Sequence, residues 1–310
     1  MDLNTLYDAL YSVTAIPIVP YRDGQIDYDG HAKNVRYLMH NNTLDNGRKR
    51  IVAIAGTSLI HHFTPEEQLR LIDRTGREME GDGLLMSGIV PNPIATAEAL
   101  IRAQAQLPRP PDVYLIMPLT GVADPDGIYA TYFQMGERLG REFGTRFLLY
   151  MRVKSHRDTF IRLINDSEHF VGVKVGTTED DIKPLIDGIG DSGIVMWGIG
   201  DRCTRAAELG AKGHTSGIAI VAAKASDALN NAQRHGDYET SRRVEQAVAA
   251  LEDLRFMNDR QFNYSAVVEA MILGGWSDVE AGEGGPFNPR VPAAVAEKVS
   301  AAIETLRGYH

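Results

Sequence analysis

The chain contains a single cysteine, Cys203, among its 310 residues. One thiol cannot form an internal disulfide, and by itself it cannot build a thiolate metal cluster. The simplest interpretation of Cys203 is a thiol packed on a helix. This cysteine usage is typical of a protein that folds in a reducing compartment, so we expect a cytoplasmic location.

Long apolar segments are also missing. No apolar stretch reaches the roughly 18 residues that a membrane span requires, and the N-terminal segment lacks a basic stretch followed by an apolar run. The 32 Lys and Arg residues are scattered and are outnumbered by 41 Asp and Glu, which gives a formal net charge of −9. Neither a nucleic-acid footprint nor a membrane patch is predicted. We expect a small-molecule partner and a protein that is neither secreted nor membrane-embedded.

Internal repeats and low-complexity linkers are absent, and the composition, with 44% hydrophobic and 24% charged residues, is that of a globular protein. What the sequence contains is a series of short apolar runs separated by helical patterns. Most runs are continuously apolar rather than alternating, as expected of parallel strands covered on both faces. Eight predicted strands begin at Val13, Ile51, Leu84, Val113, Phe147, Phe170, Ile194 and, with the weakest pattern, Gly213.

The segments between these runs are predicted helices. The one after Thr64 opens with a capping residue, Pro65, Glu66 and Glu67, a typical helix start. Alternating strands and helices imply a parallel sheet, and eight units favour a closed (β/α)8 barrel. From about residue 220 onward the pattern is helical, with a Gly/Pro-rich break at 282–292. We therefore predict a barrel domain over 1–222 and a C-terminal helical region over 223–310.

A lysine on the sixth predicted strand is the first candidate catalytic group, because barrel active sites lie at the C-terminal ends of strands. Alternation predicts that Phe170, Gly172, Lys174 and Gly176 face the interior while the intervening valines face outward. Loss of hydration in such a pocket lowers the pKa of a lysine and provides a nucleophilic amine. The alternative is a lysine that reaches the rim or pairs with an acid.

Two further segments carry polar groups at strand ends. Tyr150 and Arg152 share the interior face of the preceding strand, where Tyr150 could transfer protons; alternatively it is a packed residue with one hydrogen bond. After Gly56, the hydroxyls of Thr57 and Ser58 and the turn's N–H groups suit a carboxylate. A simple strand-ending turn is the alternative there.

Four segments in order carry a resemblance to a known family. They are GTSLIHHFTPEEQ from Gly56, NPIATAEAL from Asn92, the tyrosine of LLYMR, and VGVKVGTTED. Together they resemble G-T-T-G-E…L-T-x-E-E, N-x-T-x-E-A and I-G-I-K-x-s-x-x-D of the dihydrodipicolinate synthase and N-acetylneuraminate lyase family. Order and spacing agree across nearly the whole chain.

The resemblance implies a barrel with C-terminal helices in a homo-oligomer, usually a tetramer, with a dimer as the alternative. It implies that Lys174 forms an imine with a 2-oxo acid, commonly pyruvate, and that Tyr150 is the acid/base. It also implies that Thr57 and Ser58 hold the substrate carboxylate. No metal or organic cofactor is expected.

The sequence departs from the family pattern in three places. Leu59 and Ile60 stand where the family motif carries G-E, and the turn at 118–121 reads Pro-Leu-Thr-Gly instead of P-Y-Y-N. Ser155 lies near the point where the family offers an arginine for a second carboxylate. The chain is therefore predicted not to be a true dihydrodipicolinate synthase.

Four polar residues near the predicted mouth are additions to the family pattern, and they could recognise a different substrate: Arg152, Lys154, His61 and His62. The simpler interpretation of the two histidines is a solvated turn, because adjacent histidines do not readily chelate one metal and no third ligand is suitably spaced. The predicted function is a Schiff-base lyase that cleaves a 2-oxo-3-deoxy sugar acid or a related compound. The alternatives are dehydration through the same imine and a barrel that binds a metabolite without turnover.

Overall fold

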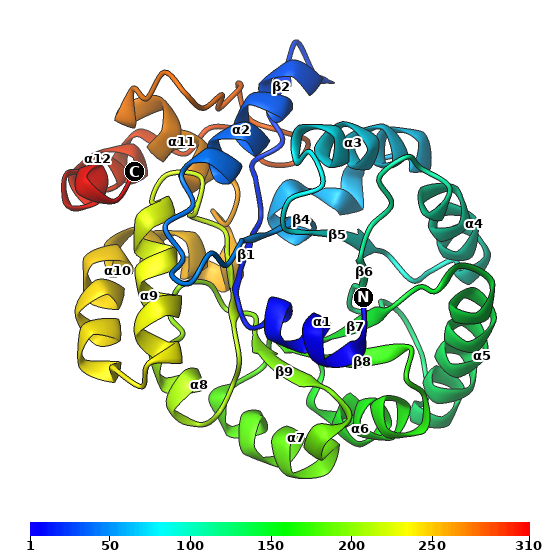
Figure 1. Ribbon diagram of the computed structural model, residues 1–310. Helices are drawn as coiled ribbons and strands as arrows, with labels where there is room; N and C mark the ends of the chain where they lie inside the picture. The colour runs from blue at the N-terminus through cyan, green and yellow to red at the C-terminus, as the bar shows by residue number, and fades with distance from the viewer.

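A computed structural model describes all 310 residues. Eight parallel strands form a closed barrel in the order β1-β10-β9-β8-β7-β6-β5-β4 (Figure 1). Every predicted apolar run supplies one strand, the weak eighth included, so the predicted (β/α)8 barrel is confirmed. The strands are β1 (Val13–Ala15), β4 (Ile51–Ile54), β5 (Leu84–Ile89), β6 (Val113–Ile116), β7 (Phe147–Met151), β8 (Phe170–Val175), β9 (Ile194–Trp197) and β10 (His214–Ser216).

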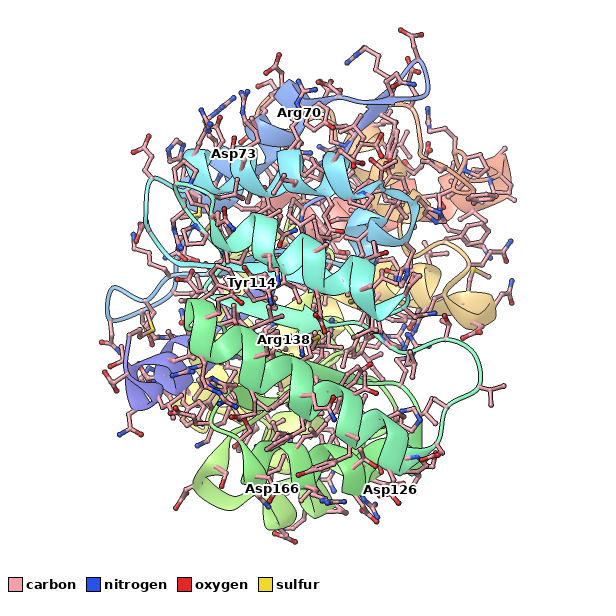
Figure 2. The ribbon with its side chains drawn as sticks, turned by 90° about the vertical axis from the view of Figure 1, so that its right-hand side faces the viewer. Arg70, Asp73, Tyr114, Asp126, Arg138 and Asp166 are labelled. Atoms are coloured by element: carbon pink, nitrogen blue, oxygen red, sulfur yellow. The ribbon has the colours of Figure 1, made fainter.

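Helices surround the barrel and carry charge on their outer surfaces. Figure 2 shows this layer from the side, where Arg138 of α5 lies toward α4 and forms an ion pair with Glu98. Helix α3 begins as predicted, because Thr64 and Glu67 form a reciprocal capping box. The helices of this layer are α2 (Tyr28–His40), α3 (Pro65–Glu78), α4 (Ile94–Ala105), α5 (Pro125–Phe143), α6 (Arg157–Asp166), α7 (Ile182–Ile189), α8 (Thr204–Glu208) and α9 (Ala223–Arg234).

Short elements complete the fold. A hairpin outside the barrel, not predicted from the sequence, joins β2 (Tyr21–Arg22) to β3 (Gln25–Ile26) through an Asp-Gly turn whose two residues have positive φ. The 3-10 turns are η1 (Gly56–Ser58), η2 (Ile60–His62), η3 (Lys154–His156), η4 (Glu179–Asp181), η5 (Gly190–Ser192) and η6 (Arg307–Tyr309). No helix is both long enough and apolar enough to span a bilayer.

One end of the barrel is covered by the N-terminal helix α1 (Leu3–Leu10), which lies across the centre of Figure 1. Its residues Leu6 and Leu10 are buried, and the Tyr7 hydroxyl donates to the Ser192 carbonyl, 2.8 Å away, just before β9. This helix therefore closes the N-terminal end of the strands and leaves the C-terminal end for a site.

The chain after α9 forms three helices that pack on one another: α10 (Tyr238–Arg260), α11 (Ser265–Gly274) and α12 (Ala293–Leu306). The Tyr264 hydroxyl donates to the Val19 carbonyl at 3.0 Å, and Asn34 exchanges two hydrogen bonds with the Glu280 backbone. These contacts attach the C-terminal region beside the open end of the barrel. The predicted boundary between residues 222 and 223 stays a prediction.

The predicted alternation along β8 is correct for Lys174 and wrong for Phe170. The Phe170 ring packs outside the barrel, against Gly136 of α5. Opposite this point the register with β7 shifts between Phe147 and Leu148, and Gly172 has φ +151°. The bulge absorbs one residue, so Lys174 faces the interior although Phe170 does not.

Candidate active site

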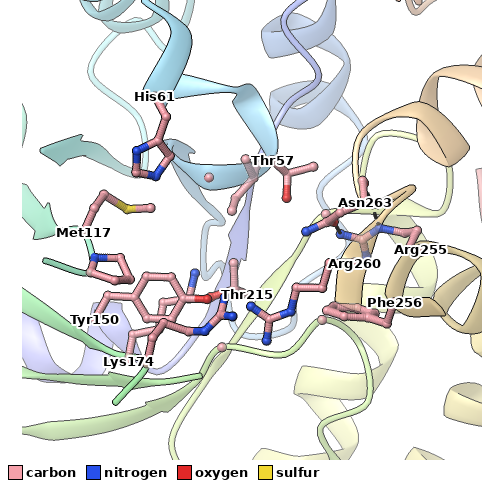
Figure 3. A pocket seen from close by; sticks show the side chains of 17 residues that line it. Thr57, His61, Met117, Tyr150, Lys174, Thr215, Arg255, Phe256, Arg260 and Asn263 are labelled. Carbon is pink, nitrogen blue, oxygen red and sulfur yellow. Dashed lines mark hydrogen bonds between the residues drawn. The ribbon is translucent and has the colours of Figure 1, made fainter. Parts of the chain in front are cut away.

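A cavity of about 190 Å³ opens at the C-terminal ends of the strands. Figure 3 shows Tyr150 and Lys174 on one side, Arg255, Phe256 and Asn263 on the other, and Arg260 between them. The lining residues are Ile16, Gly56, Thr57, His61, Met117, Pro118, Tyr150, Arg152, Lys174, Gly198, Gly200, Thr215, Gly217, Arg255, Phe256, Arg260 and Asn263. The cavity therefore joins barrel strands to the C-terminal helical region.

Lys174 is nearly fully buried, with 5% of its surface exposed, and it makes no ion pair with a carboxylate. Its side chain occupies the space left by Gly198, where a Cβ would come within 2.9 Å of the lysine stem. Burial first, and then the charge of Arg152, lower the pKa of Lys174 from 10.5 to about 7. A substantial neutral fraction of this amine is therefore present at neutral pH.

Tyr150 lies beside the lysine because β7 and β8 are paired in a register that places Tyr150 opposite Lys174. The lysine Nζ is 4.3 Å from the centre of the tyrosine ring. Burial raises the pKa of Tyr150, so its hydroxyl keeps its proton at neutral pH. Arg152 follows on the same strand face, is exposed, and lines the same cavity.

The residues of the turn after Gly56 do not all present their polar groups to the cavity. Thr57 is buried, lines the cavity, and makes no side-chain hydrogen bond within the chain. Ser58 is also buried, but its hydroxyl donates to the Pro17 carbonyl at 2.8 Å and its N–H donates to Ala55. The structure therefore brings Gly56 and Thr57 to the cavity, whereas the polar groups of Ser58 are used within the fold.

The additional polar residues near the mouth also divide into some that line the cavity and some that do not. Both histidines are exposed, but only His61 lines the cavity; the His62 ring lies 5.1 Å from that of Phe287. Lys154 and Ser155 are exposed in η3 and do not line the cavity. Of the four additional polar residues, His61 and Arg152 therefore share the cavity with Lys174, whereas His62 and Lys154 do not.

The turn after β6 also departs from the pattern expected of a synthase. Met117 and Pro118 line the cavity, but Thr120 points to the neighbouring loop, where it accepts a hydrogen bond from Asn92 at 3.1 Å. Thr120 and Gly121 do not line the cavity. This turn thus contributes no hydroxyl to the surroundings of Lys174.

Sequence reasoning missed the contribution of the C-terminal region: Arg255, Phe256, Arg260 and Asn263. Arg255 is buried, forms an ion pair with Glu252, and donates to Asn263 Oδ1 at 2.6 Å. The sequence signal was the interruption of an otherwise helical pattern by NDRQFN, residues 258–263, with Arg255 just before this segment and Arg260 inside it.

Comparisons with known proteins agree on one family. The model of the dihydrodipicolinate synthetase family matches residues 152–299, a range that includes Lys174. A curated relative, 4-hydroxy-tetrahydrodipicolinate synthase of Psychrobacter sp. (strain PRwf-1), is 22% identical over 248 residues, covering 79% of this chain and 80% of the relative.

Solved structures share the fold over almost the whole chain. Dihydrodipicolinate synthase from Bacillus clausii matches with a TM-score of 0.85 at 23% identity, covering 97% of this chain and 99% of the other. The enzyme from Oceanobacillus iheyensis matches with a TM-score of 0.86 at 21% identity, covering 98% and 99%. The solved structures thus show the same fold, and the family model and the curated relative are both similar to this chain at the level of the dihydrodipicolinate synthetase family.

Proposed function

We propose that this protein is a lyase of the aldolase type that forms a Schiff base between Lys174 and the C2 carbon of a 2-oxo acid. The substrate is a pyruvate-type donor or a 2-oxo-3-deoxy sugar acid. The observation that supports this most strongly is the state of Lys174: buried in a cavity, without a carboxylate partner, and with its pKa lowered to about 7. A structural lysine would instead be paired or would reach solvent.

The reaction begins when the neutral Lys174 amine attacks C2. Loss of water gives a protonated imine, which accepts the electron pair released when the C3–C4 bond breaks. The products of that step are an aldehyde and an enamine, and protonation of C3 followed by hydrolysis releases the 2-oxo acid. Tyr150, beside the lysine, takes the proton of the C4 hydroxyl as the bond breaks and returns a proton to C3. Thr57 and the N–H groups near Gly56 hold the carboxylate.

Dehydration is the second reaction that the same imine supports. Loss of a C3 proton gives the enamine, and a hydroxyl group on C4 then leaves as water. The fold and the lysine serve both outcomes equally, so the reaction is either a carbon–carbon or a carbon–oxygen lyase reaction.

We infer that the protein is not a dihydrodipicolinate synthase in the strict sense. Leu59 and Ile60 replace the acidic motif, and Thr120 lies where the synthase turn carries a tyrosine. We also infer a homo-oligomer, tetramer or dimer, from the family; light scattering of the purified protein measures its mass.

The test is reductive trapping. The protein is incubated with pyruvate and borohydride, and its mass and peptide map are measured. One reduced adduct on Lys174 is expected, and none in Lys174→Ala. A panel of 2-oxo acids then ranks substrates. Absence of an adduct with every acid would contradict the proposal, and an adduct without turnover of any sugar acid would favour a barrel that only binds a metabolite.

A further inference from the structure

The cavity in front of Lys174 concentrates positive charge. Its lining contains Lys174, Arg152, Arg255 and Arg260 and no carboxylate, whereas the whole chain has a formal net charge of −9. Neighbouring cations repel one another unless an anion is placed between them. The imine chemistry uses the lysine and gives the three guanidinium groups of the lining no part in the reaction.

Arg255 is held rigidly at the cavity wall. Its Nε and Nη2 atoms donate to the Asn263 carbonyl and side chain at 3.3 and 2.6 Å, and Nη1 donates to Glu252. A Cβ on Gly217 would collide with this guanidinium, and one on Gly200 would collide with Glu252. The two glycines at the ends of β10 and β9 therefore leave room for the pair. Each terminal nitrogen of Arg255 keeps a second N–H.

Arg260 is brought to the same place by an unusual backbone. Helical geometry stops at Met257, and Asn258, Asp259 and Arg260 follow with φ of 49°, 56° and 72°. Three successive left-handed residues other than glycine are costly, and such strain persists where the surroundings require it. The Arg260 side chain makes no ion pair or hydrogen bond within the chain, and its guanidinium lies 5.5 Å from the centre of the Phe256 ring.

We propose that Arg255 and Arg260 of the C-terminal region form an anion-binding subsite facing Lys174, and that the substrate is therefore a 2-oxo acid with a second carboxylate at its far end. Arg152, on the lysine's side of the cavity, adds to the positive charge. This inference rests on the proposed function, which places the oxo carbon at Lys174 and the first carboxylate at Thr57. In Figure 3 the lysine and Arg255 lie on opposite sides of the cavity, with Arg260 between them. Planar guanidinium groups match a carboxylate in geometry and charge.

The first test does not depend on the imine. Glutarate and pentanoate are titrated into the protein by calorimetry, because they share a five-carbon chain and differ in one carboxylate. We expect glutarate to bind at least about tenfold more tightly, and Arg260→Met to reduce its affinity by about 10- to 100-fold, the usual effect of removing a hydrogen bond to a charged group. Arg243→Met, on the same helix but outside the cavity, is the matched control.

The second test measures the half-saturating concentrations of 2-oxoglutarate and 2-oxopentanoate in borohydride trapping. The wild type should prefer the diacid at least about tenfold, and Arg260→Met should lose that preference while still trapping 2-oxopentanoate. Labelling of Lys174 with equal preference for both acids would overturn the subsite and leave the imine standing.

Failure of every 2-oxo acid to label Lys174 would overturn the proposed function, and the glutarate titration would still decide the subsite. Equal binding of glutarate and pentanoate in that titration would reject the subsite. Inorganic phosphate is tested as a competitor, because its anionic oxygens can accept the same hydrogen bonds as a carboxylate. Displacement of glutarate by phosphate at lower concentrations than by succinate would overturn the assignment to a carboxylate.

Discussion

Removal of the Lys174 charge should stabilise the protein, and it should do so most strongly at low pH. Below neutral pH the side chain is a buried cation without a carboxylate partner. Its pKa falls from 10.5 to about 7, mainly because of burial and secondarily because of Arg152. At 1.36 kcal/mol per pH unit, the protonated lysine costs at most roughly 5 kcal/mol of folding free energy.

The direction of the pH dependence follows from proton binding. Between about pH 7 and the pKa of an ordinary lysine, the unfolded chain holds a proton at this residue and the folded chain does not, so the free energy of unfolding rises with pH. This gain in the free energy of unfolding is complete above the pKa that Lys174 has in the unfolded chain, and it is lost as the pH falls to about 7. Lys174→Met has no titratable group at this position, so its free energy of unfolding lacks this pH dependence.

The assay is urea denaturation of the wild type and Lys174→Met near pH 6 and near pH 9. The variant should be more stable than the wild type near pH 6, and the difference should shrink by about 1.4 kcal/mol for each pH unit above 7. Lys183→Met, exposed on α7, controls for the loss of a lysine in general. A difference between Lys174→Met and wild type that is the same at both pH values would refute the reasoning.

Three further predictions concern chemistry and fold. Tyr150→Phe keeps the ring and its packing, so its thermal midpoint should be nearly unchanged while kcat on the acid found by trapping falls by roughly 10² to 10⁴; full activity would reject the acid/base role. Because Thr120 replaces the relay tyrosine, the protein should not efficiently condense pyruvate with aspartate semialdehyde, and a rate typical of a synthase in a coupled assay would contradict this. Gly172→Ala should lower the free energy of unfolding by about 1 to 3 kcal/mol, since its Cβ would meet the Ile194 carbonyl at a φ of +151°; an unchanged denaturation midpoint would count against the bulge.

Local pattern was sufficient to predict the barrel because seven of the eight strands are apolar runs covered on both faces, and the eighth, His214–Ser216, follows in the same alternation with helices. It was also sufficient to bring Lys174, Tyr150, Arg152 and Thr57 to one cavity, since these residues follow strand ends and alternate regularly near them. The prediction was wrong at Phe170, where the register shift is set by pairing with β7. Alternation within one strand carries no information about its partner's register.

The cavity wall opposite the lysine could not be predicted in this way. In the sequence, Glu252 and Arg255 form an ordinary pair three residues apart on a helix, typical of a solvated face. In the structure both are buried, because α10 lies against the ends of β9 and β10 and the glycines there leave space. Ser58 shows the opposite case, since it belongs to the predicted motif yet its hydroxyl is used by Pro17.

The sequence by itself determined the class of fold, the order of its elements and the strand-borne lysine, because periodicity and strand-end position are local properties of the chain. Only the tertiary structure decided what surrounds that lysine. Its lowered pKa depends on burial by distant segments. The positive charge of the cavity depends on α10, which begins more than 60 residues after Lys174 and ends in a left-handed segment that brings Arg260 to the cavity. Such contacts arise from packing between elements far apart in sequence, which no local pattern records.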